Sequence, residues 1–395
     1  MKIAFFADNF YPELSGIADT ISLTGAELAR RGHEIHFFVP RYSAKDYEIA
    51  KAPRIELFSR EKNILIHRMR SFKYPTPTMQ GRSVIPRLFA GFFSKEKFDI
   101  LHTHSFFGPG LDAFFYSRIK KIPLVGTNHT IIEEFMDYSP IKAAWMKEAM
   151  RKYVRWYYSR CKKISTPSNF LANDMRDNGF KVPSEVISNP IAPEFYGNKM
   201  PNLKEKFGFK PFTTLYAGRI SEEKGVLTLF DAFIPFAKKN PEVGLVLVGQ
   251  GTLRKILEKK AKESAVSSQI TFRGPFWGEQ KKDFFDIFRA CDLFVAPSRA
   301  ESQCMSMFQA MASGTAVIGA NAAAIPEFIT SERGLLFTPG NARELEARLD
   351  AIYKNPKLRS DLSKNAESFA KNFSVDQIAN KWENFYSEVV SQYGK

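Results

Sequence analysis

Two cations stand together in the segment GRISEEKG (Gly218–Gly225), directly after an apolar run. Arg219 and Lys224 are five residues apart, and the glycine that closes the segment allows the backbone to approach a ligand. Such a pair beside a helix N-terminus favours a diphosphate, because the helix end adds partial positive charge of its own. The ordinary alternative is a solvated loop in which Lys224 pairs with Glu222 or Glu223.

A second segment, ESQCMSMFQAMASG (Glu301–Gly314), begins with a carboxylate where a loop enters a predicted helix. Backbone N–H groups around Cys304–Ser306 suit phosphate oxygens, whereas Glu301 would repel them and is better suited to accept hydrogen bonds from sugar hydroxyls. Gln309 lies about two turns further along and can accept from a ribose hydroxyl through its amide oxygen. The alternatives are a helix cap worth roughly 1 kcal/mol for Glu301 and a polar helix flank for Gln309.

The histidines raise the question of a metal. His102 and His104 are two residues apart in FDILHTH and would face the same side of a strand. All six histidines lie in the first half, and neither a third ligand cluster nor an Asp-x-Asp pattern accompanies the pair. We therefore expect no metal and no other cofactor, with cations such as Arg219 and Lys224 supplying the electrostatic stabilisation. His102 is interpreted as a structural hydrogen-bonding residue.

Both halves of the chain alternate short apolar runs with amphipathic segments, which predicts βα units around a parallel sheet in each. The predicted strands of the first half are Lys2–Ala7, Glu34–Pro40, Phe98–His104, Ile122–Thr130 and Lys162–Ser168. Those of the second half are Phe212–Arg219, Val243–Gly251, Gln269–Gly274, Cys291–Ser298 and Thr315–Ala320. The fold class is therefore α/β, with two doubly wound domains.

The domains are expected at residues 1–190 and 191–374. Two prolines and an asparagine in ISNPIAPEF (Ile187–Phe195) break both helix and strand at the join. The last amphipathic segment, residues 375–395, has no strand after it and is expected to be a helix that crosses back to the first domain. Ligands of open α/β sheets bind beyond the carboxyl ends of the strands, which predicts a site in a cleft between the two domains.

Composition limits the function classes. The chain has 395 residues, 44% hydrophobic and 25% charged, as expected for a globular protein with two domains. No apolar run reaches membrane-spanning length, and the N-terminus lacks signal-peptide features. The three cysteines have no metal or redox spacing, which suits a reducing cytoplasm. Residues 1–190 carry 29 Lys and Arg against 19 Asp and Glu, whereas residues 191–395 carry 28 against 23, so the first half faces an anionic partner more strongly.

Seven segments in order resemble one known family, the GT-B-fold retaining glycosyltransferases of the glycogen-synthase-like group, glycosyltransferase family 4. They are YPELSGIADTISLTGAELARRGHEIHFF, FDILHTHSFFG, STPSNFLANDM, AGRISEEKG, LVLVGQG, CDLFVAPSRAESQCMSMFQAMASG and GLLFTPGN. Each segment alone is a weak signal, but the ordered set is specific and covers nearly the whole chain. The resemblance implies a GT-B fold with an interdomain cleft and transfer of a hexose from a nucleotide sugar with retention of configuration.

The resemblance also implies residue roles. Arg219 and Lys224 would neutralise the leaving diphosphate, Glu301 would hold sugar hydroxyls, and His104 would lie by the sugar C1 and C6 hydroxyl as a further catalytic residue. Donor-binding positions would be Gly16, Gly249, Gly274, Pro275, Cys304, Met305, Ser306 and Gln309. With no carboxylate placed for a covalent intermediate, the leaving phosphate is expected to help deprotonate the acceptor.

The chain departs from the family pattern at several positions. Gln309 stands where the family usually has Glu, Cys304 where it usually has Gly, and ISNPI lacks the Gly-Ile/Val-Asp that commonly follows the Asn. A neutral Gln keeps hydrogen-bonding capacity but loses the charge-assisted part, about 1 kcal/mol per bond. These changes bear on donor choice and turnover rather than on the fold.

The acceptor side is expected in the first domain. TNHTIIEEFMDYSP (Thr127–Pro140) is similar to a stretch of bacterial diacylglycerol glucosyltransferases, and places His129 and Glu133 beside the acceptor. The next segment, Ile141–Lys163, has eight Lys or Arg, one Glu, two Trp and three Tyr. Its basic stripe is Lys147, Arg151 and Arg155, and its apolar stripe is Met146, Met150, Tyr153, Val154 and Tyr157. A basic amphipathic helix fits an anionic membrane surface, whereas the alternative is a domain helix whose apolar side packs on the sheet.

The leading hypothesis is a glycosyltransferase that uses a UDP-sugar, UDP-glucose first, and a membrane lipid such as diacylglycerol. It would act in the cytoplasm, peripherally on the inner face of the cell membrane. Alternatives are transfer to undecaprenyl-linked or lipopolysaccharide sugars, and a nucleotide-sugar-binding relative with deficient turnover. A nucleic-acid partner is not expected, because no fold signature for one is present.

Overall fold

The computed structural model describes residues 1–394 apart from 14, 51, 55, 59, 74–80, 87–95, 132–143, 198–201 and 277–279. The chain divides into two compact units. The first, here the N-terminal unit, is Met1–Pro190 with Val375–Lys395, and the second, the C-terminal unit, is Ile191–Ser374. The chain first passes between them at Pro190, inside the segment whose prolines break regular structure.

The N-terminal unit is built on a seven-stranded parallel sheet with the strand order β3-β2-β1-β6-β7-β8-β9. Its strands are β1 (Lys2–Phe6), β2 (Glu34–Pro40), β3 (Ile64–Met69), β6 (Ile100–Thr103), β7 (Leu124–Thr127), β8 (Lys163–Thr166) and β9 (Ser184–Val186). A separate two-stranded antiparallel sheet is formed by β4 (Ser71–Lys73) and β5 (Arg82–Val84).

Helices cover both faces of this sheet. Successive residues of a strand point to opposite faces, so each strand contributes side chains to the packing on both sides. Ile3 and Phe5 of β1 pack in one hydrophobic cluster with residues of α1 and α15. Ala4 and Phe6 pack in the other with residues of α3, α5 and α6. The helices are α1 (Gly16–Arg30), α2 (Ala44–Ala50), α3 (Gly108–Lys120), α5 (Ala144–Tyr158), α6 (Asn169–Asp177) and α15 (Val375–Tyr393).

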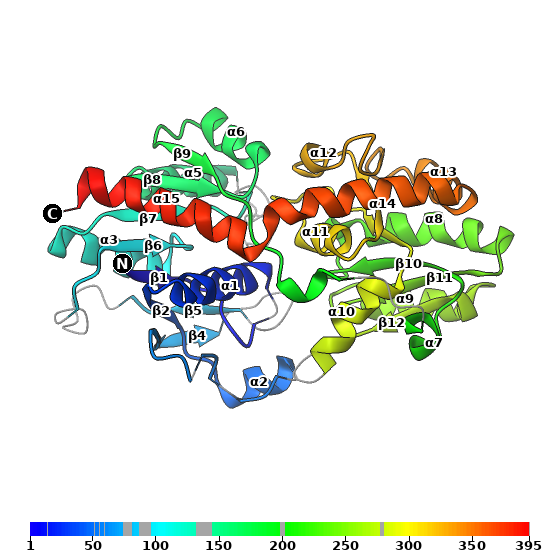
Figure 1. Cartoon of the computed structure of the whole chain (residues 1–395), viewed down its shortest axis with the longest axis horizontal. Helices are drawn as coiled ribbons and strands as arrows, with labels where there is room; N and C mark the ends of the chain where they lie inside the picture. The colour runs from blue at the N-terminus through cyan, green and yellow to red at the C-terminus, as the bar shows by residue number, and fades with distance from the viewer. Residues whose placement is uncertain are drawn as a thin grey trace. The chain divides into compact units, whose positions relative to one another are not determined.

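The C-terminal helix α15 lies beside α1 on this sheet, as the red and blue ribbons of Figure 1 show. Trp382 and Tyr386 of α15 are buried in the cluster of the N-terminal unit. Arg31, at the end of α1, adds ion pairs of 2.6 Å each to Asp376 and Glu383. The predicted return of this segment to the first domain is confirmed.

The C-terminal unit contains a six-stranded parallel sheet with the order β12-β11-β10-β13-β14-β15. Its strands are β10 (Phe212–Ala217), β11 (Val243–Val248), β12 (Ile270–Arg273), β13 (Leu293–Ala296), β14 (Ala316–Ala320) and β15 (Leu335–Phe337). Its α-helices are α7 (Leu203–Phe207), α8 (Val226–Lys239), α9 (Arg254–Glu263), α10 (Lys281–Ala290), α11 (Met305–Ala312), α12 (Ile325–Phe328), α13 (Ala342–Lys354) and α14 (Pro356–Ala370). Short 3₁₀ turns are η2 (Pro193–Phe195), η3 (Glu222–Lys224), η4 (Ser267–Gln269) and η6 (Lys371–Phe373).

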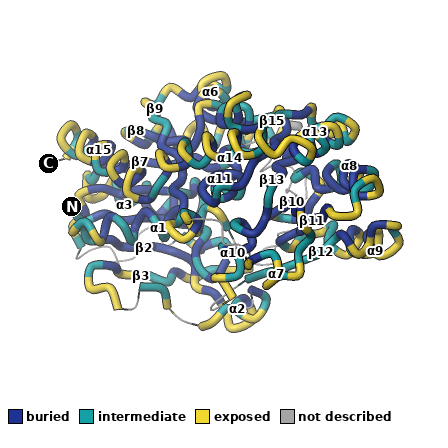
Figure 2. Tube along the Cα trace, turned by 45° about the vertical axis from the view of Figure 1, so that its right-hand side comes forward, coloured by how far each residue is buried: buried dark blue, intermediate teal, exposed yellow. Residues whose placement is uncertain are grey.

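All ten predicted strands are present, and both sheets are parallel with helices on their faces, so the predicted α/β doubly wound architecture is confirmed. The central strands are buried along their length, while the outer sides of the helices are exposed (Figure 2). The short edge strands β9 and β15 and the edge strand β3 were not expected, because none has the continuous apolar run of a central strand. The predicted cleft between the domains stays a prediction.

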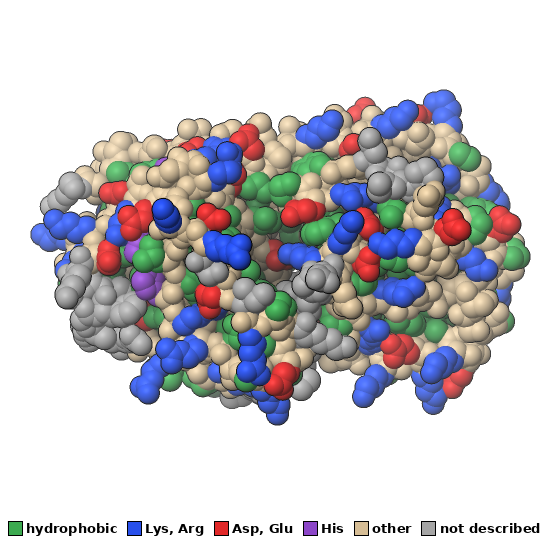
Figure 3. All heavy atoms as spheres, turned by 60° about the horizontal axis from the view of Figure 1, so that its bottom comes forward, with side chains coloured by type: hydrophobic (Ala, Val, Ile, Leu, Met, Phe, Trp, Pro, Cys, Tyr) green, Lys and Arg blue, Asp and Glu red, His purple; other side chains and the backbone are tan. Residues whose placement is uncertain are grey.

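Surface charge is mixed on the face shown in Figure 3, where Lys and Arg side chains alternate with Asp and Glu. Within the described part of the chain, no helix is both long and apolar enough to cross a bilayer.

Candidate functional site

The two segments with predicted phosphate and sugar contacts meet in the C-terminal unit. Lys224, in the turn η3 after β10, places its Nζ 2.7 Å from Oε1 of Glu301, which follows β13. Both side chains are mostly buried, at 17% and 16% exposure. Burial lowers the pKa of Lys224, but the charge of Glu301 and its hydrogen bond outweigh this effect, so the pKa lies above its ordinary value. Lys224 therefore carries a fixed positive charge and is paired with Glu301, which follows the neighbouring strand.

Gly225 makes this approach possible. Its φ of +64° favours glycine, and a Cβ there would lie 2.1 Å from the carbonyl oxygen of Pro297. The loops after β10 and β13 are therefore in direct backbone contact. Arg219 lies in the first of these loops, and its Nη1 is 3.7 Å from Oε1 of Glu223.

Cys304 directly precedes α11 and adopts a left-handed conformation with φ +67° and ψ +69°. A side chain at positive φ costs on the order of 1 kcal/mol, so Cys304 stands at a backbone position that favours glycine. Burial raises the pKa of the Cys304 thiol, and the charge of Glu301 adds to that increase, so the thiol is neutral at ordinary pH. Met305 and Ser306 form the first turn of α11 and are half-buried.

Glu301 is not the cap of α11, because the residue that precedes the helix is Cys304. Its backbone oxygen instead accepts a hydrogen bond from Ala324 N, at 3.1 Å. Gln309 lies in the second turn of α11 and is half-buried. Its amide has no hydrogen-bond partner among the described residues, so it is available to a ligand.

Glycines shape the neighbouring strand ends. Gly249, after β11, has a φ of +144°, and a Cβ there would lie 1.9 Å from the carbonyl oxygen of Gly218. Gly274 follows β12 with a φ of +74° and precedes Pro275, which is half-buried. These two of the predicted donor-binding glycines, Gly249 and Gly274, thus lie where neighbouring strands end in close contact.

Arg254 fixes these loops, although no sequence motif points to it. Its Nη1 donates hydrogen bonds to the carbonyl oxygens of Gly249 (2.6 Å), Gly274 (3.1 Å) and Arg273 (3.2 Å). Arg254 is the first residue of α9, an unfavourable place for a cation beside the positive helix end. That misplaced charge is the signal from which its positioning role could have been inferred.

The predicted histidines lie together at the carboxyl ends of β6 and β7 in the N-terminal unit. Nδ1 of His104 is 2.9 Å from Nε2 of His129. Burial lowers the pKa of His104 well below its ordinary value and that of His129 to about 4, so both rings are neutral. His102 is hydrogen-bonded through both ring nitrogens, to the Tyr386 hydroxyl and to Oγ1 of Thr127, each at 2.7 Å, which agrees with its structural interpretation.

Gly16 is the exposed first residue of α1, where the hydroxyl of Ser15 accepts a hydrogen bond from Ile17 N at 3.2 Å. Glu133 lies outside the described residues. Across the described chain, no three His, Cys, Asp or Glu side chains form a group that could hold a metal ion. The individual roles given to the site residues stay predictions.

Two acids follow β1 that the motifs do not include, the half-buried Asp8 and the buried Glu13. Asp8 accepts a hydrogen bond from the Ser105 hydroxyl, and burial raises its pKa to about 6. Glu13 accepts from Asn9 Nδ2 (2.9 Å) and from the Tyr42 hydroxyl (3.1 Å), and burial raises its pKa to about 7. Acids placed directly after an apolar strand, as in FFADNFYPE, are the signal that indicates them.

Helix α5 packs its apolar stripe on the N-terminal unit. Val154 and Tyr157 are completely buried, whereas Met150 and Tyr153 pack against the same cluster in part. The alternative of a domain helix is therefore correct for these four residues of the stripe. The cations and two tryptophans lie on other sides of the helix, with Trp145 71% and Trp156 38% exposed.

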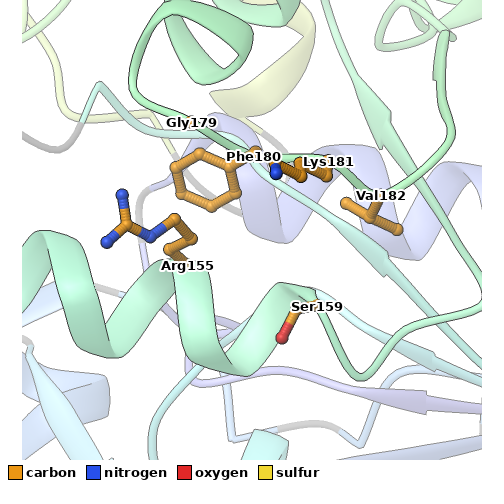
Figure 4. Close-up of a pocket in the computed structure, with 6 residues that line it drawn as sticks. All are labelled: Arg155, Ser159, Gly179, Phe180, Lys181 and Val182. Carbon is orange, nitrogen blue, oxygen red and sulfur yellow. The ribbon is translucent and has the colours of Figure 1, made fainter.

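A shallow pocket of about 440 Å³ opens beside the end of α5 (Figure 4). It is lined by Arg155, Ser159, Gly179, Phe180, Lys181 and Val182. Arg155 donates a hydrogen bond of 3.4 Å to Asn178 O at its edge. None of the predicted site residues lines this pocket.

Comparison with known proteins agrees with the fold and the motifs. Residues 14–195 match the family described as "Glycosyltransferase Family 4", and residues 200–369 match "Glycosyl transferases group 1". Alpha-monoglucosyldiacylglycerol synthase of Streptococcus pneumoniae is 28% identical over 333 residues, 80% of this chain and 70% of that protein. The synthase of the same name from Acholeplasma laidlawii is 23% identical over 410 residues, 100% of this chain and 99% of that protein.

Solved structures share the fold across both units. Sucrose-phosphate synthase from Thermosynechococcus elongatus superposes with a TM-score of 0.79 at 18% identity, covering 99% of each chain. Anabaena HepE in complex with UDP and glucose superposes with a TM-score of 0.73 at 19% identity, covering 98% of this chain and 99% of that one. The chain therefore belongs to the GT-B-fold glycosyltransferases that combine a family 4 domain with a group 1 domain, and it is a sugar-transferring enzyme.

Proposed function

We propose that the enzyme transfers glucose from UDP-glucose to a membrane lipid such as diacylglycerol, with retention of configuration. The observation that carries the donor side is the Lys224–Glu301 pair, which holds a cation and a carboxylate together at the strand ends. The lipid acceptor is supported by two relatives that are named alpha-monoglucosyldiacylglycerol synthases and align with most of the chain.

In the proposed reaction, the bond between the sugar C1 and the diphosphate oxygen breaks, and a bond from the acceptor oxygen to C1 forms. The acceptor proton passes to the leaving diphosphate. Lys224 and Arg219 stabilise the negative charge that develops there, which is usually the largest electrostatic contribution in such transfers. Glu301 and Gln309 accept hydrogen bonds from sugar and ribose hydroxyls.

The enzyme is proposed to act peripherally on the inner face of the cell membrane. Trp145 and Trp156 are exposed on α5, and Lys152 and Arg155 of the same helix are exposed as well. Tryptophan prefers the membrane interface, and each nearby cation contributes about 1 kcal/mol of attraction to anionic lipid. The excess of cations in residues 1–190 supports the same partner.

The test is transfer from UDP-glucose, UDP-galactose, UDP-GlcNAc and GDP-mannose to diacylglycerol in phosphatidylglycerol vesicles, with a soluble sugar as the alternative acceptor. We expect UDP-glucose to be the preferred donor and an α-linked glycolipid to be the product, with the anomer read by NMR. A β-linked product contradicts retention. Equal transfer to the soluble sugar contradicts the lipid acceptor, and transfer from none of the donors contradicts the proposed function.

Two alternatives follow from particular observations. The basic N-terminal unit suits an undecaprenyl-linked or lipopolysaccharide sugar equally well, and preferred transfer to such an acceptor over diacylglycerol would favour it. Gln309 favours a nucleotide-sugar-binding relative with deficient turnover. That reading requires an inactive wild type that gains transfer through Gln309→Glu, and turnover by the wild type excludes it.

A further inference from the structure

His104 and His129 form an imidazole pair whose two outer nitrogens differ in surroundings. The inner contact joins Nδ1 of His104 to Nε2 of His129, and the rings are stacked at 19° with centroids 5.2 Å apart. Nε2 of His104 is enclosed and has no hydrogen-bond partner within the described residues. Nδ1 of His129 likewise has no partner among them, but this atom is not fully enclosed, although His129 as a residue is buried at 9% exposure.

The ring of His104 is held between other rings. His102 lies against it at 4.0 Å between centroids, and Phe5 stacks on it at 5.6 Å and 17°. His102 is itself fixed by its hydrogen bonds to Tyr386 and Thr127. The ring of His104 is therefore enclosed by other rings although the residue as a whole is half-buried, and within the described residues the one polar contact of this ring is with His129.

The shared hydrogen bond couples the tautomers of the two rings, because each neutral imidazole carries a single proton. If Nδ1 of His104 donates, Nε2 of His129 accepts, and the proton of His129 must be on its Nδ1. In the opposite arrangement, His104 would carry its proton on the enclosed Nε2. Buried N–H donors without an acceptor are rarer than buried acceptors without a donor, which favours the first arrangement.

We propose that His104 is a positioning residue that fixes the ring and tautomer of His129, so that His129 presents an Nδ1–H donor to an oxygen atom of the nucleotide sugar. This inference rests on the proposed function for its ligand. It departs from the expected direct contact between His104 and the sugar, since among the described residues the one ring nitrogen of His104 with a polar contact points to His129.

Two substitutions of His104 distinguish a positioning role from direct contact with the sugar, because each keeps a polar group near one ring nitrogen and removes the other. Asparagine places its amide near the position of Nδ1, so His104→Asn retains a donor to His129 and loses Nε2. Glutamine reaches the position of Nε2, so His104→Gln loses the contact with His129. We expect His104→Gln to lower kcat by roughly tenfold, the loss of one oriented hydrogen bond, with KM little changed. His104→Asn should recover most of that loss. The reverse order would show direct contact through Nε2 and would overturn the proposal, as would equal losses in both variants.

The tautomer is measured without turnover. Ring ¹⁵N shifts of the histidine-labelled full chain, assigned with His129→Gln, should show His129 as the Nδ1–H form in the wild type. They should show a mixture of tautomers in His104→Gln. An Nε2–H form of His129 in the wild type overturns the inference even if the variants do not fold. If the enzyme transferred no sugar, the proposed function would be wrong. The ring ¹⁵N shifts would still show which tautomer His129 adopts beside His104.

Discussion

The Lys224–Glu301 ion pair, 2.7 Å from Nζ to Oε1, links two loops that are 77 residues apart in the chain. The carboxylate proposed to receive sugar hydroxyls is thus held in place by the cation proposed to face the diphosphate. Neither side chain is free to rotate without leaving a largely buried charge unpaired, which costs several kcal/mol.

Lys224→Met should lower kcat/KM for transfer by about 10²–10³, because it removes the cation that stabilises the leaving diphosphate. It should also lower the thermal midpoint, since Glu301 loses its partner. The double variant Lys224→Met, Glu301→Gln should recover the midpoint but not the activity. Lys260→Met removes an exposed cation of α9 and serves as the control. A Lys224→Met variant within a few-fold of the wild-type rate would refute the assigned role.

Gly249→Ala should greatly weaken UDP binding, measured by calorimetry. The new Cβ would lie 1.9 Å from Gly218 O, so the ends of β10 and β11 must separate. Gly208→Ala is the matched control, because it also introduces a side chain at positive φ, but nothing lies within 4 Å of its Cβ. We expect the control to lose only about 1 kcal/mol of stability and to bind UDP normally. Equal affinity for UDP in both variants would argue against this strand end as part of the nucleotide site.

Glu13→Gln should stabilise the enzyme at alkaline pH. Burial raises the pKa of Glu13 from 4.5 to about 7, so between these values the unfolded chain ionises while the folded chain keeps the proton. The free energy of unfolding therefore falls as pH rises through this window. Glutamine does not titrate, so the variant should regain at most about 3 kcal/mol of the free energy of unfolding above pH 7. Near pH 4 it should gain nothing.

Thermal midpoints at several pH values measure the Glu13 effect. Glu48→Gln, whose carboxylate belongs to a side chain 70% exposed, is the control and should show no comparable change. A variant that is less stable than the wild type at alkaline pH would mean that the hydrogen bonds of Glu13 to Asn9 and Tyr42 outweigh its burial.

Trp145→Ala should weaken binding to phosphatidylglycerol vesicles by roughly tenfold, because an exposed indole is lost from the proposed interface. Sedimentation with vesicles measures this effect. Added salt should weaken vesicle binding of the wild type and of the Trp145→Ala variant alike. Ile256→Ala removes a side chain that is 50% exposed on α9 of the other unit and should leave binding unchanged. Equal binding by the two variants would exclude Trp145 from the membrane contact.

Periodicity in the sequence was sufficient to predict the architecture. Buried parallel strands are continuous apolar runs, so Lys2–Phe6 or Val243–Val248 can be recognised without any partner strand. The same reasoning fails at the sheet edges, where β3 and β15 are only partly buried and their pattern depends on what covers them. The apolar stripe of α5 could be read as membrane-facing or as core, and only packing of Val154 and Tyr157 decided it.

The sequence alone determined which residues stand at the strand ends: Arg219, Lys224, Glu301 and His104 follow recognisable strands and loops. Tertiary structure decided their partners. Lys224 pairs with Glu301 rather than with its neighbours Glu222 and Glu223, and Arg254 binds carbonyl oxygens of two separate loops. Such contacts join residues far apart in the chain and depend on strand order, which hydrophobic spacing does not encode.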